Sequence, residues 1–242
     1  MIFLAGMFLR NPPIGWSPEG WTPTASQISQ RAAKDYSLRE TVKTWQFWIL
    51  CLLFCLNSIA GVSLISQAAP IFEEIGGMSA VAAGSMVGFL SIANGGGRLF
   101  WGWISDLATR KITLFVMFLV QAILFWIFPS LASTTLLGTA AFVIVLCYGG
   151  GFGIMPAFTA DYFGSHNVGS IYGLMFIPWS VAAAFGPLAF AYLRQVTGDY
   201  GRALHIIATV MAASTLLPSI LSPPRSNSQF EVFQEGVVRG SK

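Results

Sequence analysis

The sequence predicts an all-α membrane protein with six transmembrane helices. Six apolar blocks of 18–26 residues follow one another between Gln46 and Leu221, and none has a charged residue at its middle. A helix of that length can cross the ~30 Å hydrocarbon core of a bilayer. Charged residues make up 10% of the chain and hydrophobic residues 55%, whereas an average soluble domain has ~25% charged residues. In lipid the backbone must bond to itself, which favours helices.

The blocks divide the chain into four regions. They lie at 46–67, 80–101, 112–129, 135–158, 168–193 and 203–221. Together they form the expected six-helix transmembrane bundle at 46–221. Residues 1–9 are apolar but too few to span a bilayer, and we interpret them as the tail of a preceding transmembrane helix. The polar residues 10–45 are expected to form a cytoplasmic linker, and residues 222–242 a cytoplasmic tail.

The distribution of positive charge predicts the orientation. The linker, the turn after the second block and the tail together hold 11 of the 13 Lys and Arg residues. The other side of the membrane receives only Arg194 and Arg202. Because cytoplasmic loops carry an excess of Lys and Arg, both termini are expected in the cytoplasm. The expected location of the protein is the plasma (cell inner) membrane. The net charge of +3 is mild and forms no basic stripe, so no nucleic-acid partner is predicted.

Small residues recur at the spacing that allows close helix packing. The G-x-x-x-G pattern occurs at Gly84 and Gly88, Gly149 and Gly153, and Gly169 and Gly173. Such pairs let backbones approach closely in a membrane. Two interpretations are open: the glycine pairs serve tight static packing, or they belong to helices that move during transport. In addition, Pro156, Pro178 and Pro187 predict kinks in the fourth and fifth spans.

The turn after the second block resembles the cytoplasmic signature of the major facilitator superfamily, G-x-x-x-D-[RK]-x-G-[RK]-[RK]. The matching residues are Gly102, Asp106, Arg110 and Lys111, whereas Leu107 and Thr109 depart from the pattern. The resemblance implies a gating role for the four matching residues. Asp106 would act with Arg110 as a conformational latch, or it is a solvated loop carboxylate. Arg110 and Lys111 are expected at the lipid headgroups, where they fix the orientation.

A wider set of segments resembles the C-terminal half of the oxalate/formate antiporter (OFA) family within that superfamily. The segments are Arg10-Asn11-Pro12-Pro13, Gln46-Phe47-Trp48, Asn94-Gly95-Gly96-Gly97-Arg98, Tyr148-Gly149-Gly150-Gly151-Phe152 and Asp161-Tyr162-Phe163-Gly164. The resemblance implies twelve spans in two six-helix halves, of which this chain would be the second. A missing N-terminal six-helix half or a second copy of the chain is therefore an expected partner. The chain is then a fragment or a natural half-protein.

Polar side chains on the spans are the candidates for substrate binding, because transporters bind substrates near the bilayer midplane. The candidates are Arg98, Asn57, Gln67, Asn94, Tyr148, Tyr172 and Trp179. Each of the uncharged residues could instead bind a neighbouring helix. Arg98 is expected to attract a small organic anion. The resemblance implies a basic residue on the fifth span in oxalate carriers, but residues 168–193 contain none. A monocarboxylate such as formate, lactate or pyruvate, carried with protons, therefore fits better than strict oxalate exchange.

No catalytic motif is present in the sequence. It has no G-x-S-x-G, no His/Cys cluster with metal-ligand spacing and no phosphate-binding loop, so no catalytic residue, metal or cofactor is predicted. The expected function is secondary active transport of a small mono- or dicarboxylate by alternating access. The alternative is a non-transporting half that assembles with, or regulates, a full-length carrier.

Overall fold

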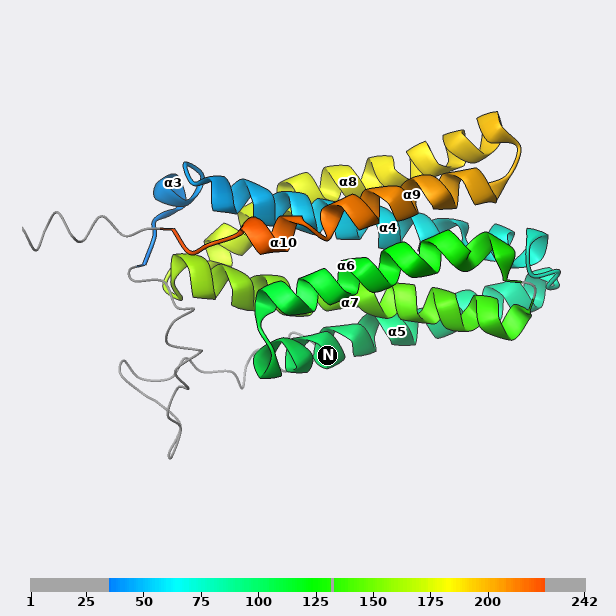
Figure 1. Cartoon of the computed structure of the whole chain (residues 1–242), viewed down its shortest axis with the longest axis horizontal. Coiled ribbons are helices and arrows are strands. Elements are labelled where there is room, and N and C mark those ends of the chain that lie inside the picture. Colours follow the sequence, from blue (N-terminus) through cyan, green and yellow to red (C-terminus); the bar gives the residue numbers. More distant parts are fainter. Residues whose placement is uncertain (1–34, 132, 225–242) are drawn as a thin grey trace, which may run out of the picture. The chain divides into compact units, whose positions relative to one another are not determined.

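The computed structural model describes residues 35–131 and 133–224 (Figure 1). The chain divides into two units, residues 1–30 and residues 31–242, and every element below belongs to the second unit. The expected helix tail at 1–9, most of the expected linker and nearly all of the expected tail lie outside the described residues.

The described part of the chain is helical and contains no strand. Its elements are α3 (Leu38–Thr41), α4 (Trp45–Glu74), α5 (Ala80–Leu107), α6 (Arg110–Ile127), the 3-10 helix η1 (Phe128–Ser130), α7 (Thr134–Phe163), α8 (Val168–Thr197), α9 (Tyr200–Ser214) and α10 (Leu217–Ile220). Six of these helices cover the six predicted blocks, which confirms the all-α fold class. The last block is not continuous as predicted: α9 ends at Ser214 and α10 begins at Leu217. Pro218 explains the break, because it has no N–H to bond the carbonyl one turn earlier.

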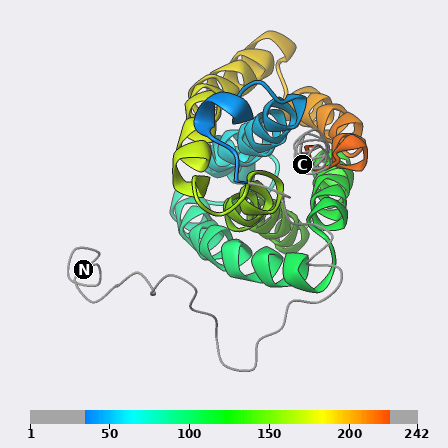
Figure 2. The same cartoon turned by 90° about the vertical axis from the view of Figure 1, so that its left-hand side faces the viewer.

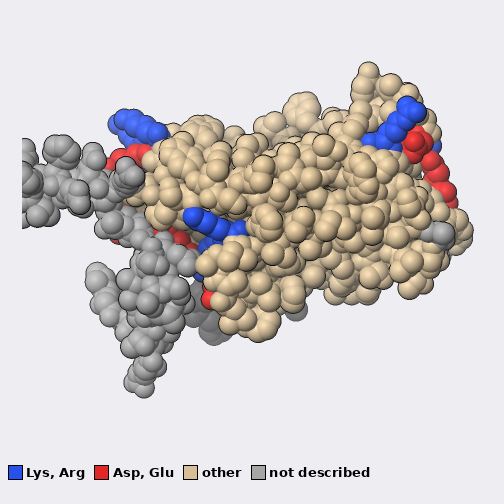
Figure 3. Space-filling model, in the orientation of Figure 1, with Lys and Arg blue, Asp and Glu red and all other residues tan. Residues whose placement is uncertain are grey.

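Five of the helical segments are long and apolar enough to cross a membrane. They are Trp45–Glu74, Arg110–Ser130, Thr134–Phe163, Val168–Thr197 and Tyr200–Ile220. The helix α5 has 28 residues but is not among the five, and it contains six glycines as well as Arg98 and Asp106. Figure 3 shows the charged side chains gathered toward the two ends of the bundle, with an uncharged zone between them. That distribution is typical of a helix bundle in a bilayer.

The helices pair across the bundle. The most extensive contacts are those of α5 with α7, α4 with α8 and α6 with α9. Viewed end-on, α4 and α7 lie in the middle, with α5 and α8 on one side and α6 and α9 on the other (Figure 2). In its most apolar 18-residue stretch, α7 is 61% buried, whereas α8 is only 22% buried. The face formed by α8 is therefore the most open part of the described bundle.

The short helix α3 holds the end of the linker against the bundle. The helix α3 ends at Thr41, four residues before α4 begins at Trp45. Ser37 and Glu40 form a capping box at the start of α3. Just before it, the backbone N–H of Tyr36 donates to the carbonyl of Phe163 at 2.8 Å. We call the end of the bundle that carries α3 the linker end and the opposite end the far end.

Glycines bring α5 and α7 into backbone contact. A Cβ at Gly149 would overlap the carbonyl of Asn94, and a Cβ at Gly153 would overlap the carbonyl of Arg98. Gly97 on α5 lies equally close to the carbonyl of Leu146. The predicted close packing at Gly149 and Gly153 is thus confirmed.

The other two G-x-x-x-G pairs do not pack against the described residues, contrary to the prediction. A Cβ at Gly84, Gly88, Gly169 or Gly173 would meet no described atom within 4 Å. Spacing alone identifies a face on which a helix could approach closely, but it does not say which helix lies there. These glycines belong to α5 and α8, two helices that Figure 2 shows on the same side of the bundle.

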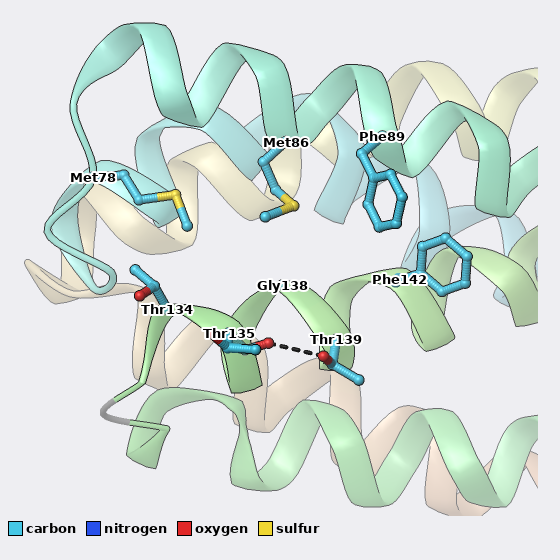
Figure 4. A pocket seen from close by; sticks show the side chains of 8 residues that line it. All are labelled: Met78, Met86, Phe89, Thr134, Thr135, Gly138, Thr139 and Phe142. Carbon is cyan, nitrogen blue, oxygen red and sulfur yellow. Dashed lines mark hydrogen bonds between the residues drawn. The ribbon is translucent and has the colours of Figure 1, made fainter.

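The seam between α5 and α7 opens toward the far end into a groove of about 510 Å³ (Figure 4). Its lining includes Met86 and Phe89 of α5, and Gly138 and Phe142 of α7. The rings of Phe89 and Phe142 stack with centroids 4.9 Å apart. Flexible Met side chains can adapt to a change in the separation of two helices. The glycine contacts therefore fix one part of this seam while the far end stays open.

Candidate functional site

Arg98 is the charged residue of the candidate binding site. It projects from α5 next to Gly97, whose backbone is pressed against α7. Its side chain is exposed, and its guanidinium carbon lies 4.7 Å from the ring centroid of Phe152 on α7. A cation over an aromatic face gains about 0.5–1 kcal/mol when exposed. Among the described residues no carboxylate pairs with Arg98. The guanidinium is therefore positioned but has its anion-binding capacity free.

An aromatic cluster surrounds Phe152. The ring centroids of Tyr148 and Trp179 lie 5.4 and 5.6 Å from that of Phe152. Tyr172 packs edge-on against Phe176 at 4.9 Å, and Phe176 in turn lies 6.3 Å from Phe152. The structure thus brings together four of the residues predicted from the sequence: Arg98, Tyr148, Tyr172 and Trp179.

The phenylalanines of this cluster were missed by the sequence reasoning, which considered only polar side chains. They are Phe54, Phe152 and Phe176. A signal for two of them was available. Phe152 follows Tyr148 by four residues and Phe176 follows Tyr172 by four, so each pair shares one face of a helix.

Asn57 lies in a buried polar network. Its amide nitrogen donates to the carbonyl of Tyr148 at 3.0 Å, and its amide oxygen accepts from Gln121 Nε2 at 2.9 Å. The side chains of Asn57 and Gln121 are both almost fully buried. A Cβ at Gly151 would overlap the amide of Asn57, so this glycine leaves the space that the network needs. Asn57 therefore joins α4, α6 and α7 rather than facing the aromatic cluster with a free amide.

The other two predicted polar residues lie in different places. Asn94 is one turn before Arg98 on α5, and its amide oxygen is buried with no hydrogen-bond partner in the part of the chain that the structure describes. Gln67 lies toward the far end of α4, where its amide oxygen is 3.4 Å from the hydroxyl of Tyr200. The structure thus places Asn94 close to the Arg98 region along α5 but associates Gln67 with α9.

An ion pair lies near Gln67, at the far end. Arg194 Nη2 contacts Glu74 Oε2 at 2.7 Å, which joins α8 to α4. The guanidinium of Arg194 also lies 5.2 Å from the ring centroid of Tyr200. The far end is thus held by a charged contact between α4 and α8.

The predicted gating residues form part of a charged cluster at the linker end. Arg110 Nη1 donates to Asp106 Oδ1 at 2.5 Å and to Ser105 Oγ at 2.6 Å. Arg110 Nε donates to Asp161 Oδ2 on α7 at 3.1 Å. Asp106 is 62% exposed and Asp161 only 21% exposed, so the better-shielded pair is the one between α6 and α7.

Asp161 and Ser105 were not predicted as members of this cluster. Asp161 belongs to one of the segments that carry the family resemblance, but its distance of 51 residues from Arg110 hides the contact. The structure leaves Gly102 without any described atom within 4 Å of a Cβ, and Lys111 is half-buried. Thr109, which departs from the signature, caps α6 by accepting from the N–H of Ile112 at 3.2 Å. The gating role of these residues stays a prediction.

No cluster of three or more His, Cys, Asp or Glu residues that could hold a metal ion occurs in the described part of the chain. What the arrangement offers is one free guanidinium beside an aromatic wall, with ion pairs at both ends of the bundle. Such an arrangement can bind a small anion with an apolar part.

Comparison with known proteins gives three informative relatives. The oxalate:formate antiporter of Oxalobacter formigenes is 31% identical over 161 residues, which are 63% of this chain and 37% of the antiporter. The uncharacterized MFS-type transporter YhjX of Escherichia coli (strain K12) is 27% identical over 152 residues, 62% of this chain and 38% of the relative. Apicoplast pyruvate carrier 1 of Toxoplasma gondii is 27% identical over 225 residues, 85% of this chain and 39% of the carrier.

These matches cover 37–39% of the length of each relative. The chain therefore corresponds to well under two thirds of the proteins that it resembles. The first of them confirms the resemblance to the oxalate/formate antiporter family that the sequence segments indicate. All three relatives are named as transporters or carriers, and none of the three names is that of an enzyme.

The family is shown by a match that covers most of the chain. Residues 1–187 match the Major Facilitator Superfamily. The match includes the signature turn at 102–111, the aromatic cluster and Arg98. The chain belongs to the Major Facilitator Superfamily.

Proposed function

We propose that the chain is the C-terminal half of a secondary active transporter that carries a small monocarboxylate across a membrane by alternating access. The observation that carries the proposal is the guanidinium of Arg98, held over Phe152 at 4.7 Å beside an aromatic cluster. A carboxylate in a membrane protein needs a cationic partner, because an unpaired buried charge is very costly. Arg98 would supply that partner, and the aromatic rings would contact the apolar part of the substrate.

The number of cations favours one carboxylate over two. The sequence has no Lys or Arg between residues 168 and 193, so α8 offers no second cation at the depth of the aromatic cluster. A dicarboxylate would then have one charge without a partner. The name of the pyruvate carrier supports a monocarboxylate, and the name of the oxalate:formate antiporter supports a small carboxylate in general. Protons are the proposed co-substrate.

We propose that Arg98 binds the anion, with Asn94, Tyr148, Tyr172 and Trp179 around it. Asn57 and Gln67 would contribute through the helices that they join, since their amides already contact other residues. At the linker end, Arg110 with Asp106 and Asp161 would act as the latch. Gly102 and Lys111 would complete that gate.

A second six-helix half is the proposed partner. The glycines of α5 and α8 that meet no described atom support this, because a face against lipid has no need for glycine. Small residues in membrane helices instead permit close approach of another helix. The partner would be an N-terminal half or a second copy of the chain. The proposed location is the plasma membrane, and the distribution of Lys and Arg supports an orientation with both termini in the cytoplasm.

The same open faces support a second candidate function. A half that does not transport could use the glycines of α5 and α8 to assemble with, or regulate, a full-length carrier. This candidate requires no substrate contact at Arg98. It therefore predicts that anion affinity does not depend on that residue, even in an assembly that transports.

Exchange in liposomes tests the proposed substrate class. Vesicles that contain the chain together with a six-span N-terminal half would be offered labelled formate, lactate, pyruvate and oxalate, with and without a proton gradient. We expect uptake of at least one monocarboxylate to exceed uptake of oxalate and to respond to the gradient. Uptake of oxalate alone would contradict the assignment of a monocarboxylate.

A further inference from the structure

A second cavity lies within the bundle, away from Arg98. It is a crevice of about 190 Å³ between α4, α8 and α9. Its lining includes Ile59 and Ser63 of α4, Gly186 and Ala189 of α8, and Val210 of α9. None of the residues that line this crevice also lines the groove between α5 and α7. The crevice is therefore separate from the groove between α5 and α7.

Small residues create this space. Gly186 and Ala189 contribute almost no side chain, and Ser63 is the one lining residue that has a polar side chain. A Cβ at Gly186 would already lie 3.1 Å from Ser63 Oγ. Ala189 and Val210 are exposed on the outside of the described bundle. In a bilayer the crevice would thus be open to lipid-soluble molecules.

The hydroxyl of Ser63 has no hydrogen-bond partner among the described residues, although Ser63 is completely buried. Hydroxyl groups in helices commonly donate to the carbonyl one turn earlier. Thr159 and Ser214 do so in this bundle, at 2.7 and 2.6 Å. Ser63 Oγ instead lies beside Gly186 in the wall of an otherwise apolar crevice. A buried hydroxyl without a partner favours a ligand that can accept its hydrogen bond.

Water is a poor occupant of this crevice. A buried water molecule needs two to four polar partners, and the lining side chains provide one hydroxyl. Apolar cavities of about 150 Å³ in proteins stay dry and bind molecules as small as benzene. A lipid acyl chain would fill the space but would leave the hydroxyl of Ser63 without an acceptor.

We propose that this crevice binds, from the bilayer, a small uncharged molecule with one hydrogen-bond acceptor, such as an aliphatic alcohol, ketone or ether. Its acceptor oxygen takes the hydrogen bond of Ser63 Oγ. Its alkyl part fills the space beside Gly186 and Ala189. The proposal concerns binding alone, so it can be tested without a transport measurement.

Photolabelling of the full chain in phosphatidylcholine liposomes tests the proposal. One probe is an octanol that carries a diazirine, and the matched probe is the corresponding diazirine-bearing octane without the hydroxyl. Labelled residues are identified by peptide mass spectrometry. Three variants are compared with the original chain. Ser63→Ala removes the hydroxyl, Ala189→Phe fills the mouth of the crevice, and Ser58→Ala removes another buried hydroxyl of α4 that does not line the crevice.

We expect saturable labelling by the octanol probe at the residues of α8 and α9 that line the crevice. A neutral hydrogen bond corresponds to a change in affinity of roughly 2- to 10-fold. The half-saturating octanol concentration should therefore rise by that factor in Ser63→Ala and stay unchanged in Ser58→Ala. Ala189→Phe should abolish labelling in the crevice by both probes. Circular dichroism shows whether each variant keeps its helices.

Two results would overturn the proposal. If the octanol probe labels lipid-facing residues without saturation, the crevice is not a binding site. If octane saturates the crevice as readily as octanol, and Ser63→Ala changes neither, the occupant is an acyl chain and the hydrogen bond plays no part.

Discussion

Gly153 on α7 lies so close to the carbonyl oxygen of Arg98 on α5 that a Cβ at this glycine would overlap it. The backbone of the residue that carries the free guanidinium is thus pressed directly against the neighbouring helix. The same guanidinium lies over Phe152, the residue next to Gly153 in the sequence. Backbone packing between α5 and α7 therefore determines where the positive charge of the candidate site is held.

Replacing Gly153 with alanine is expected to destabilise the bundle by about 1–3 kcal/mol, because the added methyl overpacks the seam. Thermal unfolding in detergent would measure the loss. Gly169→Ala is the matched control, since a Cβ at Gly169 meets no described atom within 4 Å. An exposed helical glycine replaced by alanine gains up to ~1 kcal/mol. Equal losses in the two variants would contradict the described packing.

Arg98→Gln is expected to weaken binding of the transported anion without unfolding the bundle. A hydrogen bond to a charged group contributes about 1.5–3 kcal/mol, which corresponds to roughly a 10- to 100-fold change in affinity. Arg98→Lys keeps the charge but loses the planar donor geometry. Its affinity for the anion should therefore fall between that of the original chain and that of Arg98→Gln. Competition for substrate uptake measures the affinities. An unchanged affinity in Arg98→Gln would remove the central residue of the proposed site.

The two acidic partners of Arg110 should differ in importance. Asp161 is 21% exposed and joins α6 to α7, whereas Asp106 is 62% exposed. We expect Asp161→Asn to reduce the free energy of unfolding by about 1–3 kcal/mol, because it weakens a shielded charged hydrogen bond. Asp106→Asn should cost less than about 1 kcal/mol, as is usual for an exposed ion pair. The reverse order in thermal unfolding would show that Asp106 is the main partner.

The buried amide network predicts that Gln121 is important for stability. Gln121→Leu leaves the amide oxygen of Asn57 buried without its donor, which is expected to cost about 1–3 kcal/mol. Substrate affinity should change little, because Gln121 lies on α6, outside the aromatic cluster. Thermal unfolding and uptake competition on the same preparation separate the two effects. A large loss of affinity at unchanged stability would place this network in the binding site.

The fold was largely predictable because span length and charge distribution are properties of the sequence alone. Six charge-poor blocks predicted six helices, and only the last was broken where Pro218 interrupts the backbone bonds. The pairing of helices was harder to predict. The spacing of Gly149 and Gly153 is identical to that of Gly84 and Gly88, yet only the first pair meets another helix among the described residues.

Only part of the candidate site could be predicted, because residue type is visible in the sequence and contacts between helices are not. Arg98 and the aromatic residues Tyr148, Tyr172 and Trp179 could be selected by residue type, and they do lie around one cluster. Gln67 could not be separated from them by type. Its position near the end of a 30-residue helix determines that it meets Tyr200 instead. Arg110 and Asp161 are 51 residues apart in the sequence, and sequence spacing cannot reveal a contact at that separation.

Reconstitution of the two halves in liposomes tests whether this chain transports a carboxylate. The chain would be placed in liposomes alone, and in a second preparation together with a six-span N-terminal half, and uptake of labelled pyruvate and formate would be measured in both. Uptake is expected when two six-helix halves are present, either from the added half or from two copies of this chain. No uptake in either preparation, with both halves folded and inserted, would contradict a transporting role and favour the assembly or regulatory alternative.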